Sequence, residues 1–255
     1  MRNVPIDEVG GLDRDVLAIS TDYPPGTLLH WHRHRRAQFL YGATGPLRVE
    51  TAEGTWTVPP HRAVLIPAGT AHQVTMIDVS TRSLYLEPAA VRWFPRYCQV
   101  VDVSPLLREL IAEAVELPGR HPRRGRDATL MSLILHEISR LAPLPLDLPL
   151  PRDERLRALC QSFVDDPRIH EPPARWAAAL HVSERTLYRL FRAETGMSFT
   201  RWRQRACVLH AVALLATGRP VAGVAASLGY GSPAAFTTMF QRLLGAPPSE
   251  YRSRA

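Results

Sequence analysis

The stretch HVSERTLYRLFRAETG, residues 181–196, decides how the C-terminal half of the chain folds. Ser183 is a residue type that caps helices, so we expect a helix to begin directly after it. Leu187, Leu190 and Phe191 then recur at helical spacing and are predicted to pack inward. The preceding PARWAAAL is typical of a compact, alanine-rich helix that ends at a short turn. A helix, a tight turn and a second helix together predict helix-turn-helix geometry.

The outward side of the second helix carries side chains that suit contact with the edges of DNA bases. Arginine can bind guanine through two hydrogen bonds, and hydroxyl groups can bond several bases. In helix-turn-helix proteins the second helix lies in the major groove, and its early residues reach the bases. The candidate DNA-binding residues on this side are Arg185, Thr186, Tyr188, Arg189 and Arg192. A solvated polar face is the alternative interpretation of the same residues.

The pattern recurs near the C-terminus, in residues 219–252. A short helix from Val221 leads to the turn GYG, and Ser232 can cap the helix that follows. That helix is predicted to bury its two phenylalanines and Leu243, and its outward positions are Ala234, Ala235, Thr237, Thr238 and Gln241. Between the two units, SFTRWRQRACVLHAVALLATG predicts one long helix, whose candidate phosphate contacts are Arg201, Arg203 and Arg205.

These segments resemble the DNA-binding domain of the AraC/XylS family of bacterial transcription factors. The resemblance rests on LYRLFRAETGMSF and on the ending LGYGSPAAFTTMFQRLLGAPPSEYR, in this order within residues 152–255. It implies that the domain binds two successive major-groove segments of double-stranded DNA, one through each helix-turn-helix unit. The second unit lacks Arg, Asn or Gln at its early outward positions. We therefore expect the first unit to carry most base specificity and the second to position the protein on phosphates.

The charge distribution separates the two halves of this 255-residue chain. Residues 1–151 hold 16 Arg and 16 Asp and Glu, which cancel, whereas residues 152–255 hold 15 Arg against 8 Asp and Glu and so carry the whole net charge of +7. A solvated basic surface or a polyanionic partner such as DNA would each explain this excess. Hydrophobic residues make up 45% of the chain, which excludes global disorder.

Cysteine usage and hydropathy bear on the compartment. Cys98, Cys160 and Cys207 follow no CxxC spacing, so we expect buried, reduced thiols in a cytosolic protein. The N-terminus has no apolar signal region, and no run of about 18 apolar residues occurs. We therefore expect a cytoplasmic bacterial protein that associates with the nucleoid and not with a membrane.

Two amphipathic helices and a proline-rich segment precede the C-terminal half. In SPLLRELIAEAVELPG, Ser104 is a candidate cap, and one apolar stripe contains Leu106, Leu107, Leu110, Ile111 and Ala114. The second helix, 127–141, is apolar around much of its circumference, which indicates burial on more than one side. We expect 91–141 to be a helical segment in which 104–117 and 127–141 pair two copies into a homodimer. The prolines of APLPLDLPLP, 142–151, favour an extended spacer between domains.

From about Val16 to Leu86 the sequence is typical of short strands. LRVET, TWTV, AVLIP and RSLYLE are separated by turn formers such as AEG and PAG. Evenly spaced short strands predict a small β-barrel or jelly roll over residues 1–90. The predicted fold class is therefore α+β with two domains. A cupin-like barrel and its two helices precede an all-α domain, 152–255, in which a long helix joins two helix-turn-helix units.

HWHRHRRAQF, residues 30–39, sets three histidines at every second position. Successive side chains of a strand point to opposite faces, so on a regular strand the three imidazoles and Gln38 would share one face. A fourth imidazole, His72, follows the turn in IPAGTAH. Imidazoles and an oxygen donor can complete a first shell for a divalent transition metal such as Zn, Ni, Co, Cu or Fe.

The spacing of these residues resembles the two motifs of the cupin fold. The first motif is matched by Gly26, His32, His34, Gln38 and Gly45, and the second by Pro67, Gly69 and His72. Gln38 stands where the family has an acidic ligand, and His61 and Met76 stand where the second motif has Gly and Asn. The resemblance implies a metal site made of His32, His34, Gln38 and His72. We expect His30 to lie at the barrel mouth or to contact a metal ligand from outside, and His61 to lie in a turn.

Two other interpretations of the histidines stay open. They would line a pocket for an organic ligand, or they would be satisfied polar groups of the core. In the AraC family an N-terminal cupin-type domain senses an effector, so the resemblance implies a regulator, not an enzyme, whose barrel senses a metal ion or a small molecule. A metal-dependent cupin dioxygenase or isomerase fused to a DNA-binding domain is the competing hypothesis.

Overall fold

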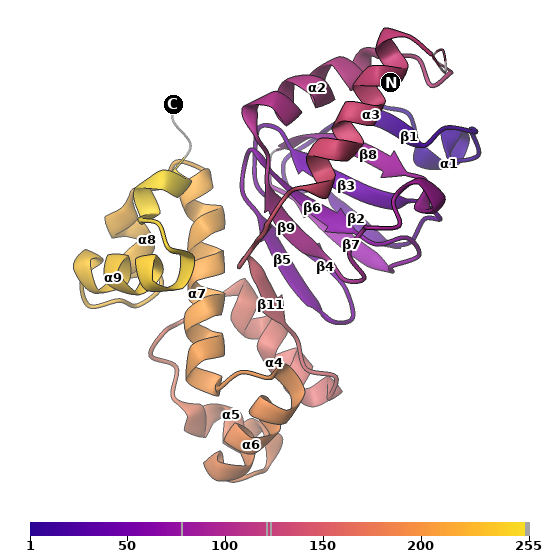
Figure 1. The fold of residues 1–255 in the computed structure, drawn as a ribbon. Helices are drawn as coiled ribbons and strands as arrows, with labels where there is room; N and C mark the ends of the chain where they lie inside the picture. The colour runs from indigo at the N-terminus through magenta and orange to yellow at the C-terminus, as the bar shows by residue number, and fades with distance from the viewer. Residues whose placement is uncertain (78, 121, 123, 253–255) are drawn as a thin grey trace. The chain divides into compact units, whose positions relative to one another are not determined.

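The computed structural model describes residues 1–77, 79–120, 122 and 124–252, and these form two compact units. The first unit contains residues 1–51 and 58–146, and the second contains residues 52–57 and 147–255 (Figure 1). The division between residues 146 and 147 falls inside the proline-rich segment. The grouping of residues 52–57 with the second unit is not predictable from local composition.

Six antiparallel strands form the first sheet of the first unit. The sheet has the order β1-β8-β3-β6-β9-β10. The strands are β1 (Val16–Tyr23), β8 (Val79–Leu86), β3 (Ala37–Gly42), β6 (Arg62–Ile66), β9 (Gln99–Asp102) and β10 (Pro143–Leu144). Strand β3 lies between β8 and β6 and is buried along its length, because both of its edges and both of its faces are covered. The predicted strands around LRVET, TWTV, AVLIP and RSLYLE are all present, whereas β9 had no clear sequence signal.

The second sheet supplies the other wall of the barrel. Within the first unit it contains β4 (Leu47–Glu50), β7 (His72–Met76) and β2 (Leu28–His32), with β7 in the middle. Along β7 buried and half-buried residues alternate, as expected for a strand with one face toward the interior. The short helix α1 (Ile6–Val9) precedes β1, and the 3-10 turn η1 (Pro88–Ala90) follows β8.

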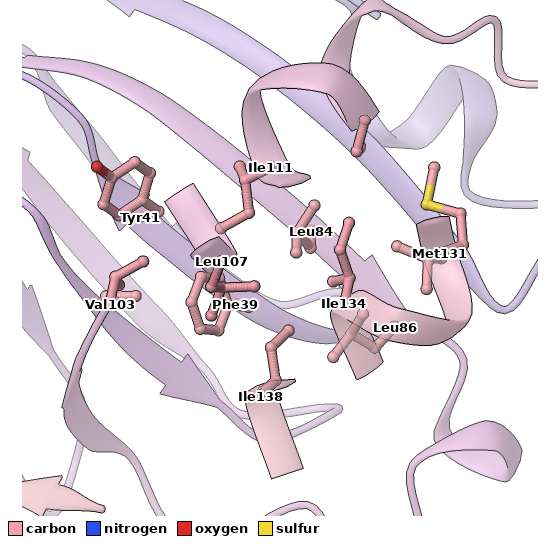
Figure 2. Packing of buried hydrophobic residues seen from close by; sticks show 14 of the residues in the cluster. Phe39, Tyr41, Leu84, Leu86, Val103, Leu107, Ile111, Met131, Ile134 and Ile138 are labelled. Atoms are coloured by element: carbon pink, nitrogen blue, oxygen red, sulfur yellow. The ribbon is translucent and has the colours of Figure 1, made fainter. Parts of the chain in front are cut away.

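Helices α2 (Pro105–Glu116) and α3 (Arg126–Ser139) cover the outer face of the first sheet (Figure 1). Figure 2 shows the contact, in which Phe39 and Leu84 of the sheet face Leu107 of α2 and Ile134 of α3. The Ser104 side chain accepts a hydrogen bond of 3.1 Å from the Leu107 amide, which confirms the predicted cap. Burial of these apolar side chains contributes about 1.5–3 kcal/mol each.

Two apolar residues of this helical layer are exposed within a single chain. Leu106 is 51% exposed and lies outside the buried stripe. Helix α3 buries Leu130, Met131, Ile134 and Ile138 on one side only, while Leu133 is 40% exposed. A helix on one face of a sheet has a single side buried by that sheet, so within one chain the apolar residues beyond that side are exposed.

The proline-rich segment is extended, as predicted, but it is hydrogen-bonded rather than a free spacer. Its beginning forms β10, which pairs with β9 in the first unit. Its later part forms β11 (Asp147–Pro149), which pairs with β5 (Gly54–Val58). A side chain on Gly54 would lie 2.6 Å from the Leu148 carbonyl oxygen, so glycine is required where these two strands meet.

The rest of the second unit is helical in its described residues, as the sequence predicts. The elements are α4 (Glu154–Asp165), α5 (Pro173–Leu180), α6 (Glu184–Thr195), α7 (Phe199–Ala216), α8 (Val221–Ser227), α9 (Pro233–Leu244) and the 3-10 turn η2 (Pro248–Tyr251). An aromatic cluster of Phe163, Trp176, Phe191, Phe199 and Trp202 holds α4 to α7 together, with ring centroids 5.1–6.3 Å apart.

The three cysteines are buried thiols that form no disulfide with one another, as predicted. Burial raises the pKa of the Cys160 thiol, and it raises that of Cys207 to about 12. Among the described residues, no helix combines the length and the apolar character that crossing a membrane requires.

Candidate functional site

Three histidines from three separate segments meet at one end of the barrel interior. His32 is the last residue of β2, His72 is the first residue of β7, and these two are register partners. His34 lies in the loop between β2 and β3, and Gln38 lies on β3. The prediction that His30, His32, His34 and Gln38 share one face of a continuous strand is therefore wrong. A bulge in β2 and the crossing between the two sheets bring the predicted ligands together instead.

The turn before His72 is bonded to the loop that carries His34. Gly69 has a φ of +74°, a left-handed conformation that favours glycine, and its amide donates a 3.0 Å hydrogen bond to the His34 carbonyl oxygen. The two sequence motifs are thus joined through the backbone, in addition to the His32–His72 pairing. This link explains why a Pro-x-Gly turn belongs in front of the histidine.

The three imidazole rings are close enough to share one ligand. Their centroids lie 4.3 Å apart for His32 and His72, 5.2 Å for His34 and His72, and 6.1 Å for His32 and His34. One nitrogen from each ring can be chosen such that all three lie within 4.8 Å of one another. Three nitrogens at such spacing can surround a divalent ion with bonds of about 2.0–2.1 Å after small movements.

Each ring is held by a hydrogen bond from Nδ1 to a backbone carbonyl. His32 donates to the carbonyl of residue 30 at 2.7 Å, His34 to that of Arg36 at 2.8 Å, and His72 to that of Thr70 at 2.9 Å. Because a carbonyl only accepts, the proton of a neutral ring is fixed on Nδ1, and the lone pair is on Nε2. This arrangement of outer partners is the one that orients metal-binding histidines.

His72 presents the strongest sign of a missing partner. Its side chain is fully buried, and its Nε2 has no hydrogen-bond partner among the residues that the structure describes. Desolvation lowers its pKa to about 4, so the ring is neutral at pH 7 and Nε2 is an acceptor. A buried acceptor without a partner is costly, and a metal ion or a ligand donor would remove that cost. Burial also lowers the pKa of His34.

Gln38 is held with its carbonyl oxygen toward the histidines. Its Nε2 donates to the Ser83 hydroxyl at 3.1 Å and to the Tyr85 hydroxyl at 3.3 Å, and its Oε1 lies 3.0 Å from His34 Nε2. Two ligand atoms of one cation, at bonds of about 2.0–2.2 Å, lie about 3.0–3.5 Å apart, which is close to this distance. Burial raises the pKa of Tyr85 to about 12, which keeps this phenol neutral. The donor set of three nitrogens and one oxygen therefore fits a divalent transition metal.

A cavity of about 330 Å³ opens next to this cluster. One wall is polar, with His32, His72, Gln38 and the hydroxyls of Ser83 and Tyr85, and another is apolar. Residues 3–7, at the N-terminus of the chain, also line it. The volume lies at the lower end of the range for small-molecule pockets. The sequence did not predict this N-terminal contribution, because residues 3–7 contain no recognisable motif.

Of the two other histidines singled out in the sequence, His61 lies in a turn as predicted, whereas a place for His30 at the barrel mouth stays a prediction. His30 is exposed and lies outside the cluster. His61 adopts a φ of +62°, a turn conformation, and lies 3.4 Å from the Tyr41 hydroxyl through its Nδ1.

In the second unit, α5 and α6 form the predicted helix-turn-helix. His181, with a φ of +56°, ends α5, and Ser183 accepts a 3.2 Å hydrogen bond from the Thr186 amide at the start of α6. Leu187 and Phe191 are buried, but Leu190 is 37% exposed, which corrects its predicted inward position. The candidate DNA-binding residues Arg185, Tyr188, Arg189 and Arg192 are exposed, and Thr186 is half-buried beside the cap.

Helices α8 and α9 form the second helix-turn-helix. Ser232 accepts a 3.2 Å hydrogen bond from the Ala235 amide, which confirms it as the cap of α9. Phe236 and Phe240 are buried, whereas Leu243 is only half-buried and Met239 takes its place in the core. On the outward side, Ala234, Ala235, Thr238 and Gln241 are exposed and Thr237 is half-buried.

The three arginines of α7 have different environments. Arg201 is exposed. Arg203 donates to the Glu171 carbonyl and lies 4.5 Å above the centre of the Phe199 ring, and Arg205 forms an ion pair with Asp147. The guanidinium groups of Arg203 and Arg205 are thus engaged inside this unit. Phosphate contact by any of the three stays a prediction.

Comparisons with known proteins agree with the two-unit structure. A family model described as an AraC-like ligand binding domain matches residues 15–137, and one described as a helix-turn-helix domain matches residues 176–254. The HTH-type transcriptional regulator NimR of Escherichia coli K12 is 33% identical over 225 residues, which cover 88% of this chain and 82% of NimR. The arabinose operon regulatory protein of Salmonella typhimurium LT2 is 33% identical over 236 residues, which cover 91% of this chain and 73% of that protein.

A solved structure, that of ToxT from Vibrio cholerae O395, covers 93% of this chain and 96% of its own, with 11% identity and a TM-score of 0.39. That TM-score is too low to support an argument.

Proposed function

The chain belongs to the AraC family of helix-turn-helix transcriptional regulators. We propose that its barrel senses an effector and that its second unit binds DNA in response. The sensor would bind a divalent transition metal or a small molecule at His32, His34, Gln38 and His72. The second unit would bind promoter or operator DNA on the bacterial chromosome, through α6 and α9.

One observation carries the metal proposal: His72 Nε2 is buried, unprotonated and without a partner in the described part of the chain. The hydrogen bonds from the three Nδ1 atoms to backbone carbonyls support it. They leave the Nε2 lone pair of each neutral ring available to bind a metal ion. A bound divalent ion would supply a positive charge to the barrel interior. With neutral Gln38 in place of an acid, we expect weaker binding than at a site of three histidines and a carboxylate.

Metal content tests this proposal directly. We expect near-stoichiometric metal by mass spectrometry in tag-free protein purified without chelator, and its loss in the variant His32→Ala/His34→Ala. The matched control is His30→Ala/His61→Ala, which removes two imidazoles outside the cluster and should keep the metal. If wild-type protein takes up no metal even after reconstitution with ZnCl₂ or NiCl₂, the metal proposal is wrong.

A second candidate is an organic effector in the same barrel, and the 330 Å³ cavity favours it. Its apolar wall includes Ile19, Leu29 and Leu40, which would pack against the body of a small molecule, while the histidines would bond its polar end. Metal-free protein whose operator affinity changes with such a molecule would support this version. The relatives are transcriptional regulators, so we propose no enzymatic activity. Dioxygenase or isomerase turnover by the metal-loaded barrel would contradict that.

We further propose that α2 and α3 pair two copies of the chain and transmit the signal. Leu106 on α2 and Leu133 on α3 are exposed within a single chain, and a partner would cover them. A ligand would shift the pairing only through different affinities for the two states. By analytical ultracentrifugation, Leu133→Glu should be monomeric, while Ser132→Glu, at the exposed neighbouring position, should stay dimeric. A Leu133→Glu variant that dimerises like wild type would contradict this interface.

A further inference from the structure

The two helix-turn-helix units contain second helices of the same construction. Helices α6 and α9 each have 12 residues, and each begins after a capping serine. Both end at a glycine in the left-handed region, Gly196 with a φ of +70° and Gly245 with a φ of +76°. Residues at the same distance from the two caps therefore occupy equivalent positions on the two helices.

At the equivalent exposed positions, the two helices differ in chemistry. Counting from the caps, Arg185 corresponds to Ala234, Arg189 to Thr238 and Arg192 to Gln241, and all six residues are exposed. Each arginine of α6 is thus replaced in α9 by a methyl-bearing or neutral side chain. The exposed residues of α9 nearest its N-terminus, apart from Pro233, offer the methyl groups of Ala234, Ala235 and Thr238.

Helix α9 is also poorly suited to hold DNA through phosphates. Its one charged side chain, Arg242, lies in the last turn and donates to Gln204 Oε1 at 3.2 Å. This differs from the expectation that the second helix mainly positions the protein on phosphates. The early residues of a recognition helix face the base edges, and there α9 has no cation and no bidentate group.

We propose that α9 recognises the C5-methyl groups of thymine, whereas α6 recognises guanine through its arginines. This inference rests on the proposed binding of DNA by the second unit. Thymine is the base whose methyl group projects into the major groove, and alanine and threonine methyls pack against it. Helix α7, with 18 residues, is about 27 Å long and joins the two helix-turn-helix units, which would bind successive major-groove segments roughly 34 Å apart. The operator then contains a guanine-containing box and, about one helical turn away, a thymine-rich box.

The size of the effect follows from the burial of one methyl group. Removing a buried methyl changes the affinity by a factor of about four, so two thymines contribute a factor of about fifteen. A bidentate arginine–guanine contact contributes more, by about tenfold or above. Most discrimination therefore comes from the α6 box, and the α9 box adds a smaller preference.

Base analogues in the operator test the inference. Full-length protein first selects its operator from random DNA, and the Arg185→Ala variant identifies the box that α6 contacts. Deoxyuridine in place of thymidine in the other box should weaken binding about fourfold per base, and by less than twofold in the α6 box. Replacing a T·A pair of the α9 box by C·G should weaken binding, and 5-methylcytosine at that position should restore much of it, because it returns only the methyl group.

A protein variant provides the matching half of the test. Thr238→Ser removes one exposed methyl and keeps the hydroxyl, so it should weaken binding about fourfold on thymine DNA and have little further effect on deoxyuridine DNA. The control Thr217→Ser makes the same change at the end of α7, where the hydroxyl donates to the Leu214 carbonyl, and should leave affinity unchanged. Thr238→Arg should shift the preference at one position of this box toward guanine.

Failure of the inference is distinct from failure of DNA binding itself. If the protein selects an operator but deoxyuridine in the second box changes affinity by less than about 1.5-fold, or if that box is rich in guanine, α9 does not recognise methyl groups. If selection yields no preferred sequence and α6 variants bind like wild type, the proposed DNA recognition by this unit is wrong.

Discussion

Two buried polar side chains, His72 and Arg36, hold the histidine-bearing end of the barrel in place. His72 has its Nδ1 on a carbonyl and its Nε2 toward the cluster. Arg36 is 2% exposed and donates to three carbonyls, those of Gly10, Leu12 and Arg14, at 2.7–3.1 Å. Its own carbonyl accepts the hydrogen bond that orients His34. One residue therefore connects the N-terminal segment to a candidate ligand.

For His72 we predict acid sensitivity of the metal-free barrel. Burial places the folded-state pKa near 4, below the unfolded value of about 6.5, so the unfolded state binds more protons between these limits. The free energy of unfolding should fall as the pH drops through this window, by about 2 kcal/mol between pH 7 and pH 5 from this residue. Urea unfolding in EDTA at both pH values measures it. His72→Asn should lose most of that pH dependence, and an unchanged dependence in the variant would contradict the prediction.

For Arg36 we predict that lysine is not an adequate replacement. The guanidinium of Arg36 donates to the three carbonyls through three separate nitrogens, which the single ammonium nitrogen of lysine cannot do. Arg36→Lys should lower the free energy of unfolding by about 2–3 kcal/mol and expose residues 1–14 to limited proteolysis. Arg35→Lys is the control, because Arg35 is an exposed ion-pair partner of Glu87 and should cost less than about 1 kcal/mol. An equal loss of unfolding free energy in both variants would contradict the role of the three guanidinium hydrogen bonds.

At the scale of single elements, helix ends are the features that local sequence specifies best. Ser104, Ser183 and Ser232 each accept a hydrogen bond from an amide three residues later, as predicted. Helix faces are specified less well, because a face is buried only where a neighbour covers it. Leu190 has the helical spacing of a core residue, yet it remains exposed.

For the end of α6 we predict that Gly196→Ala destabilises the second unit by about 1 kcal/mol in urea unfolding. The added methyl would meet nothing within 4 Å, so the cost comes only from the φ of +70°. Gly231→Ala is the control, since Gly231 has open space around it and no positive φ. A Gly231→Ala cost as large as that of Gly196→Ala would rule out the conformational explanation.

At the scale of the whole molecule, the match to a ligand-binding domain and the match to a helix-turn-helix domain fall almost entirely in different compact units. The net charge of +7 lies in residues 152–255, where the two helix-turn-helix units lie, while residues 1–151 are neutral overall. Within the described residues, a cluster of three imidazoles and an amide lies in the first unit only. Binding at the cluster should therefore stabilise one unit selectively.

We predict that ZnCl₂ protects the barrel and not the helical unit from hydrogen exchange. At a free metal concentration about one hundred times Kd, the stabilisation is about 2.7 kcal/mol. Peptides covering β2 and β7 should exchange more slowly, and those covering α5 and α6 should be unchanged, by mass spectrometry. The effect should vanish in His32→Ala/His34→Ala. Equal slowing throughout the chain, or slowing that persists in this variant, would contradict a site at the cluster.

The sequence by itself determined the features that depend on local pattern. Helical spacing and capping serines predicted α6 and α9, short strands separated by turn formers predicted the barrel, and the resemblance to the cupin motifs predicted His32, His34, Gln38 and His72 as one site. The helices and strands were predictable because backbone periodicity, turns and capping depend on only a few neighbouring residues.

Only the tertiary structure decided how these parts meet. His34 joins the cluster from a loop and not from a strand, because the chain crosses between sheets there. Arg205 is paired with Asp147, which is remote in sequence, and the proline-rich segment is taken up as β10 and β11. Such contacts depend on which distant segment lies alongside, and no local pattern of residues contains that information.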